Sequence, residues 1–137
     1  MSFVYQISPS GGHIKAVGTG KITTNDCIGI IKRVLTDPHC TPDSTAVIDL
    51  SDAVYSYKNE KEVIRIAKAL EAGKALLKNR IAIVAKRATL FPAEIFSLYM
   101  RKITHIKIRV FLNLTSAKNY CKGGRSSTAK TRYPSSG

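Results

Sequence analysis

The stretch TAVIDLSDAVYSYKNEKEV, from Thr45 to Val63, decides the fold of this chain. Its first six residues are almost all apolar, which is typical of a strand that is covered on both faces of a sheet. Ser51 and Asp52 then supply side chains that favour turns. Asn59 can cap a following helix, because its side chain can accept a hydrogen bond from a free backbone amide. The stretch therefore predicts a buried strand, a loop that begins near residue 51, and a helix.

The same alternation of strand and helix extends over most of the chain. Strands that are joined through helices need right-handed crossovers, so the pattern is typical of an α/β protein with a mostly parallel sheet. The first two strands are an exception, because the turn sequence PSGG joins them directly as a hairpin. We expect five strands and about four helices, with strands over 3–8, 13–19, 45–50, 80–86 and 106–112 and helices that begin near residues 24, 59, 92 and 113.

Periodicity and helix-ending residues predict the extent of the two middle helices. The second helix is expected to bury residues as far as Leu77 and to end at Asn79, which tolerates a left-handed conformation. The third is expected to carry Pro92 in its first turn, where the missing amide hydrogen costs nothing. Leu98 falls among the residues that this helix is expected to turn inward.

Length and composition predict one domain. Residues 1–122 are expected to form it, and the basic segment 123–137, GGRSSTAKTRYPSSG, has almost nothing to bury and is expected to be disordered. No window is apolar enough for a membrane span, and the first residues lack the pattern of a secretory signal. Cys27, Cys40 and Cys121 form no paired motif, which favours a reducing, cytoplasmic location.

Charge is the unusual feature of the composition. Twenty-two Lys and Arg residues against nine Asp and Glu give a formal net charge of +13, which favours anionic partners. Lys61, Arg65 and Lys68 recur at helical spacing and predict one basic helix face. That face is either simply solvated or binds anionic lipid headgroups at a membrane surface. Nucleic acid is the less convincing partner, because no aromatic residues alternate with these bases.

No pattern in the sequence indicates catalysis, a metal site or a cofactor. His13, His39 and His105 fall in three different parts of the predicted fold, so they are not expected to meet in a catalytic site. The cysteines and histidines lack the paired spacing of a zinc site. VGTGK, at 17–21, departs from the phosphate-binding loop pattern at two positions. We therefore expect a protein that is not an enzyme.

Four segments resemble the SpoIIAA-like, or STAS-like, domains of bacteria, which include anti-sigma-factor antagonists and STAS/SEC14-type proteins. These segments are GTGKITTND, AVIDLSDA, RIAIVAK and IRVFLNLTSA. The resemblance implies a bacterial protein with the SpoIIAA-like fold. In the antagonists, a serine at the start of the second crossover helix is phosphorylated. Here that loop falls on residues 57–60, Tyr-Lys-Asn-Glu, which contain no serine or threonine, so this phosphorylation switch is not carried over.

The loops at the carboxyl ends of the strands hold the candidate binding residues. Aromatic and apolar side chains there would form a mouth bordered by cations, suited to an amphipathic anion. The same side chains could instead pack under their own loops or form a dimer contact. The candidates are Asp52, Tyr55, Tyr57, Lys86, Arg87 and Phe91. We expect a non-catalytic regulatory or protein-interaction module, acting as a homodimer or with a protein partner; the alternative is a carrier or sensor of an apolar anionic ligand such as a lipid.

Overall fold

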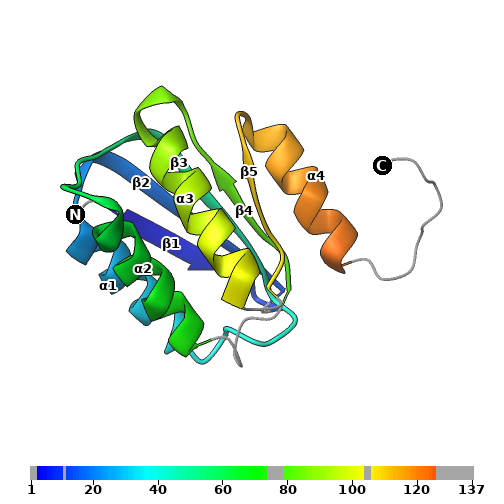
Figure 1. Cartoon of the computed structure of the whole chain (residues 1–137). Helices are drawn as coiled ribbons and strands as arrows, with labels where there is room; N and C mark the ends of the chain where they lie inside the picture. The colour runs from blue at the N-terminus through cyan, green and yellow to red at the C-terminus, as the bar shows by residue number, and fades with distance from the viewer. Residues whose placement is uncertain (1–2, 11, 74–78, 104–105, 126–137) are drawn as a thin grey trace.

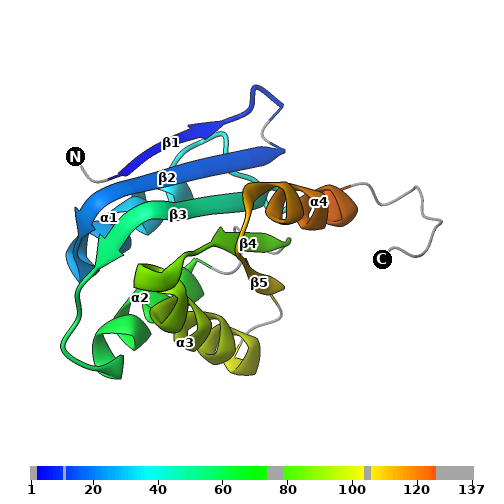
Figure 2. The same ribbon diagram turned by 90° about the horizontal axis from the view of Figure 1, so that it is seen from above.

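A computed structural model describes residues 3–10, 12–73, 79–103 and 106–125 of the chain. In this part of the chain, five strands form one sheet in the order β1-β2-β3-β4-β5. β1 pairs antiparallel with β2, and every later pair is parallel (Figure 2). This arrangement confirms the predicted α/β class with an N-terminal hairpin. The elements are β1 (Phe3–Ile7), β2 (His13–Ile22), α1 (Thr24–Leu35), β3 (Thr45–Tyr55), α2 (Glu60–Ala72), β4 (Ile81–Val84), α3 (Arg87–Ile103), β5 (Ile108–Phe111) and α4 (Leu114–Arg125).

The strand order determines where the helices lie. From β2 onward, each strand is added to the same side of the one before it. Right-handed crossovers that advance in one direction all pass over the same face of the sheet. α1, α2 and α3 therefore share one face and bury the main core against it, while α4 stands apart from them (Figure 1). α4 packs on the other face, over β3, β4 and β5.

Side-chain caps fix the starts of α1 and α2 as the sequence predicts. The Thr23 hydroxyl accepts a hydrogen bond from the Asp26 amide at 3.0 Å, and the Asp26 carboxylate accepts one from the Thr23 amide at 2.9 Å. The Asn59 side chain accepts one from the Lys61 amide at 2.9 Å. These bonds satisfy amides that the first turn of a helix leaves without partners.

The predicted end of α2 is wrong. α2 ends at Ala72, and Gly73 forms its C-cap. A Cβ atom on residue 73 would lie 2.3 Å from a methyl carbon of Leu35, so the glycine allows a close approach between α1 and the end of α2. Leu77 lies outside the described residues. Asn79 instead donates a hydrogen bond from its side-chain amide to the carbonyl oxygen of Asp43 at 2.9 Å.

β3 continues to Tyr55 instead of ending near residue 50, and a β-bulge explains the difference. Val17 pairs with Asp49 and Thr19 pairs with Asp52, so β3 contains one more residue than β2 between these pairs. Asp49 accepts hydrogen bonds from the amide and the hydroxyl of Ser51, at 3.0 and 2.6 Å. The polar residues that predict a turn therefore form a bulge inside the strand, which changes the face on which later side chains lie.

α3 begins at Arg87, so the prediction that Pro92 lies in the first turn is wrong. The carbonyl oxygen of Lys86 accepts hydrogen bonds from the amides of Thr89 and Leu90, both at 2.8 Å. The Thr89 hydroxyl accepts one from the Lys86 amide at 3.2 Å. Pro92 therefore lies in the second turn of α3, and its side chain is buried.

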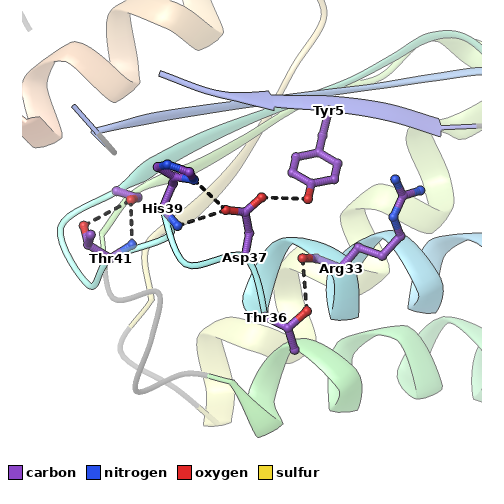
Figure 3. A network of polar contacts seen from close by, with 7 residues as sticks. Tyr5, Arg33, Thr36, Asp37, His39 and Thr41 are labelled. Atoms are coloured by element: carbon purple, nitrogen blue, oxygen red, sulfur yellow. Dashed lines mark hydrogen bonds and ion pairs between the residues drawn. The ribbon is translucent and has the colours of Figure 1, made fainter. Parts of the chain in front are cut away.

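The edge strand β1 is joined to the end of α1 by a polar network (Figure 3). The Tyr5 hydroxyl donates a hydrogen bond to Asp37 at 2.8 Å. The other carboxylate oxygen of Asp37 accepts one from the His39 amide at 2.9 Å. The Arg33 guanidinium lies 5.4 Å from the centre of the Tyr5 ring, which adds a cation–π contact. The network anchors a strand that has a neighbour on only one side.

No helix in the described ranges is long and apolar enough to cross a membrane.

α4 extends beyond the predicted domain boundary at residue 122, because it includes residues 123–125. Residues 126–137 of the basic segment lie outside the described part of the chain. Asn113 caps α4 by accepting a hydrogen bond from the Ser116 amide at 2.8 Å, as its position predicts.

Candidate interaction surface

The amino-terminal ends of α1 and α2 are linked by a chain of hydrogen bonds at the carboxyl end of β3. The Tyr55 hydroxyl lies 2.8 Å from the Thr24 hydroxyl, which donates to the Glu62 carboxylate at 2.7 Å. The other carboxylate oxygen of Glu62 accepts a hydrogen bond from the backbone amide of Lys58 at 3.0 Å. The hydrogen bond from Thr24 and then that from Lys58 hold the pKa of Glu62 below its ordinary value. Glu62 is therefore a structural anion that closes this end of the sheet.

The two tyrosines of the predicted mouth stack on each other. Their ring centres are 5.1 Å apart and the ring planes are inclined by 14°. Tyr55 is buried, and burial is the main cause that raises its pKa. Tyr57 is half-buried beside it. Tyr55 therefore packs in the core, and the half-buried Tyr57 packs against it.

The bulge separates Asp52 from the other candidates. Ala53 and Tyr55 face the core beneath α1, α2 and α3. Asp52 directly precedes Ala53 in the strand. Because side chains alternate along a strand, Asp52 points to the opposite face, where it is exposed. Asp52 therefore shares no site with Tyr55.

The remaining predicted residues, Lys86, Arg87 and Phe91, lie together at the start of α3. All three are exposed, and 64% of Phe91 is accessible to solvent. Leu98 lies two helical turns further along the same face and is 53% exposed. The outer face of α3 thus carries two large apolar side chains with Arg87 beside them.

The expectation that Leu98 faces inward is wrong. The buried stripe of α3 includes Thr89, Ala93, Phe96 and Met100, which follow helical spacing. Apolar residues occur around nearly the whole helix, so the spacing alone allowed more than one inward face. Thr89 and Ala93, small residues one turn apart, were the signal that could have identified the correct one.

Lys61, Arg65 and Lys68 form the predicted basic face of α2. All three are exposed along the side of the helix opposite to its buried Val63. Arg65 also reaches α1, where its guanidinium donates a weak hydrogen bond to the Asn25 side chain at 3.4 Å. Since α2 packs against α3, this basic face and the outer face of α3 belong to the same side of the molecule.

Two small apolar cavities lie between the sheet and the helices α1–α3. Their volumes are about 80 Å³ and about 60 Å³, and Ile30, Ile48 and Phe96 line both of them. A cavity of roughly 150 Å³ is needed to hold benzene, and ligand pockets usually span roughly 300–1,000 Å³. In this conformation the cavities cannot hold a lipid chain.

The cysteines have the properties of structural residues. Cys27 lines the larger cavity, and burial raises the pKa of its thiol to about 12. Burial is also the first cause that raises the pKa of Cys40 and of Cys121. Because the thiolate is the reactive form, none of these thiols is activated as a nucleophile. Within the described ranges, no three His, Cys, Asp or Glu side chains converge on a position where a metal could bind.

Comparison with known proteins identifies the fold. No protein-family model matches the sequence, and no curated protein matches it. Among solved structures, an uncharacterized protein of the DUF3478 family from Shewanella loihica PV-4, described as having a SpoIIAA-like fold, matches with a TM-score of 0.56. The two sequences are 18% identical, and the likeness covers 88% of this chain and 94% of that one. The chain is therefore a domain with the SpoIIAA-like, or STAS-like, fold that its motifs predict.

Proposed function

We propose that this domain is a non-catalytic regulatory module that binds a protein partner through the outer face of α3. The observation that carries the proposal is the exposure of Phe91 and Leu98 on one helix face. Exposed apolar groups gathered at one place mark interaction sites more often than single exposed residues do. Arg87 and Lys86 border them, so a partner with a complementary apolar and acidic surface fits this face best.

A second copy of the chain is one candidate partner, in keeping with the homodimer expected from the sequence. A formal net charge of +13 opposes self-association, so a homodimer would have to exclude the lysines and arginines from its centre. Cys27 and Cys121 are free thiols, which supports a cytoplasmic location as part of the proposal.

Site-specific photo-crosslinking tests the proposed face. A photoreactive phenylalanine analogue replaces Phe91 in one sample and Leu112, which is equally exposed at the end of β5, in a control sample. We expect an adduct from position 91 alone, and we expect Leu98→Ser to abolish it. Sedimentation of the purified protein then shows whether the adduct is a dimer of this chain. Equal adducts from both positions, or none from position 91, would contradict the proposal.

A carrier of an apolar anionic ligand is the second candidate, and the two apolar cavities favour it. A lipid chain would require α3 to move away from the sheet, because the present volumes are several times too small. Native mass spectrometry of freshly purified protein distinguishes the candidates: a bound mass of lipid size supports the carrier, and ligand-free protein supports the interaction module.

A further inference from the structure

The sheet face that carries α4 is covered over only part of its width. α4 packs on β3, β4 and β5, whereas β2 lies beside it with exposed side chains. On this face His13 stands next to Thr45 and Lys15 stands next to Val47, according to the pairing of β2 with β3. The flank of α4 that faces β2 carries Lys118 and, one helical turn later, Lys122.

These residues line a hollow of about 250 Å³ between β2 and α4. Its floor contains the buried side chains of Val47 and Cys121, and the Cys121 thiol is turned to the carbonyl oxygen of Ala46 at 3.4 Å. A second hollow of about 420 Å³ adjoins it over the hairpin and shares His13 and Lys15 with it. We call these two adjoining hollows the groove; the larger one falls within the size range of roughly 300–1,000 Å³ that small-molecule sites occupy.

The groove is positively charged and contains no negative charge. Lys15, Lys118 and Lys122 approach it from two elements, and no carboxylate among the described residues lines either hollow. The Thr45 hydroxyl, which is buried, holds the ring of His13 at 3.3 Å. Like charges placed together repel each other unless an anion lies between them.

We propose that this groove binds a small organic phosphate. Lysine ammonium groups bind phosphate as point charges, and the apolar floor suits the organic part of such a ligand. The chain's own segment 126–137 does not fit, because it carries Lys130 and Arg132 and no acidic residue. A second copy does not fit the groove either, because the three lysines would need an acidic surface opposite them and the chain carries a net charge of +13.

The groove lies on the opposite side of the sheet from the outer faces of α2 and α3. The proposal therefore stands or falls independently of the proposed protein-interaction face. The phosphate could belong to a soluble metabolite or to a lipid headgroup, and the experiment must separate these sources.

Amide chemical shifts measured by NMR report binding at the groove. Phenyl phosphate, which joins a phosphate to an apolar ring, serves as the soluble probe. Vesicles of phosphatidylcholine with phosphatidic acid serve as the membrane probe. We expect one or both probes to shift the amides of His13, Lys15, Thr45 and Lys122, with phenyl phosphate reporting a soluble ligand and the vesicles alone reporting a headgroup.

Two triple variants with the same change in charge separate a site from general attraction. The groove variant is Lys15→Gln, Lys118→Gln and Lys122→Gln. The control variant changes the basic face of α2, Lys61→Gln, Arg65→Gln and Lys68→Gln. We expect the groove variant to weaken binding of phenyl phosphate about tenfold or more and the control variant to weaken it about twofold or less. With the vesicles, the groove variant should remove the shifts of His13 and Thr45, whereas the control variant should keep these shifts even if it lowers the total adsorption.

Three results would overturn the proposal. The first is the absence of shifts with either probe at concentrations up to roughly 10 mM, an affinity too weak for a site. The second is an equal loss of binding in both variants, which would mean attraction to overall charge. The third is groove-dependent binding of a single-stranded oligonucleotide without binding of either phosphate probe, which would assign the groove to a nucleic acid instead.

Discussion

Asp37 connects the edge of the sheet to the end of α1. The hydrogen bond from the His39 amide is the largest cause that lowers its pKa, and the bond from the Tyr5 hydroxyl follows. The bond with Asp37 also raises the pKa of Tyr5. A carboxyl whose pKa is lower in the folded state than in the unfolded chain stabilises the fold above its ordinary pKa. This stabilisation is lost as the pH falls through the folded-state value.

The substitution Asp37→Asn tests this linkage. We expect the variant to have a lower melting temperature than the wild type at neutral pH, because it loses the negative charge that both donors favour. The difference should narrow as the pH falls below 3.8, the ordinary pKa of the carboxyl. Thermal unfolding followed by circular dichroism across this range measures it.

The matched control is Asp43→Asn, because Asp43 is exposed further along the same loop. This control should unfold at the wild-type temperature at every pH. A constant difference between Asp37→Asn and the wild type down to acidic pH would show that the charge of Asp37 does not contribute.

At the scale of elements, the bulge in β3 decides which side chains reach the core. Without its extra residue, Asp52 and Val54 would take the inward positions of Ala53 and Tyr55. Gly18 lies opposite the bulge in β2, where a Cβ atom would approach a ring carbon of Phe3 to 2.8 Å. A glycine at this position therefore lets the edge strand pack against the bulged one.

Two glycine substitutions test this packing. We expect Gly18→Ala to lower the free energy of unfolding by about 1–3 kcal/mol, the usual cost of overpacking. The control Gly29→Ala lies in α1, where nothing is within 4 Å of the added carbon. It should raise the free energy of unfolding by about 0.5–1 kcal/mol, because alanine favours helix. Urea unfolding measures both, and equal stability of the two variants would refute the argument from close approach.

The elements also show how far the sequence predicts this structure. The helix starts predicted near residues 24, 59 and 113 are confirmed, because each follows from a local cap, which Thr23, Asn59 and Asn113 provide. The bulge was not predicted, since Asp49 and Ser51 suit a turn and a bulge equally well. The outward position of Leu98 was not predicted either, because its direction depends on contacts with distant strands. The paired tyrosines were recognised as a cluster, but their burial depends on the same distant contacts.

At the scale of the whole molecule, the net charge of +13 is distributed over both sides of the sheet. The basic face of α2 lies on the side of the protein-interaction face, and the lysines of the groove lie on the other. If the basic face of α2 binds anionic membranes, removing its three positive charges must weaken membrane binding more than removing three positive charges elsewhere on the protein.

Co-sedimentation with vesicles that contain phosphatidylserine tests this face. Changing Lys61, Arg65 and Lys68 to Gln should reduce binding about a hundredfold, because each basic residue near the surface contributes about 1 kcal/mol. The melting temperature should hardly change, because the three side chains are exposed. Binding should also weaken as salt is added.

The groove variant, Lys15, Lys118 and Lys122 to Gln, is the control in the same assay. A loss of vesicle binding that is equal in the two variants would show that the α2 face has no special role and that total charge governs adsorption.

The strand order has a consequence for synthesis on the ribosome. From β2 to β5, every described strand pairs with the strand that precedes it in the sequence. No strand has to be inserted between two that have already formed, so the sheet can grow from the hairpin outward while the chain is still emerging. β2, β3 and β4 each leave one newly formed open edge, which the next strand then covers, while β1 stays at the other edge. α4 emerges after β3, β4 and β5 and can then pack over these three strands on the second face of the sheet.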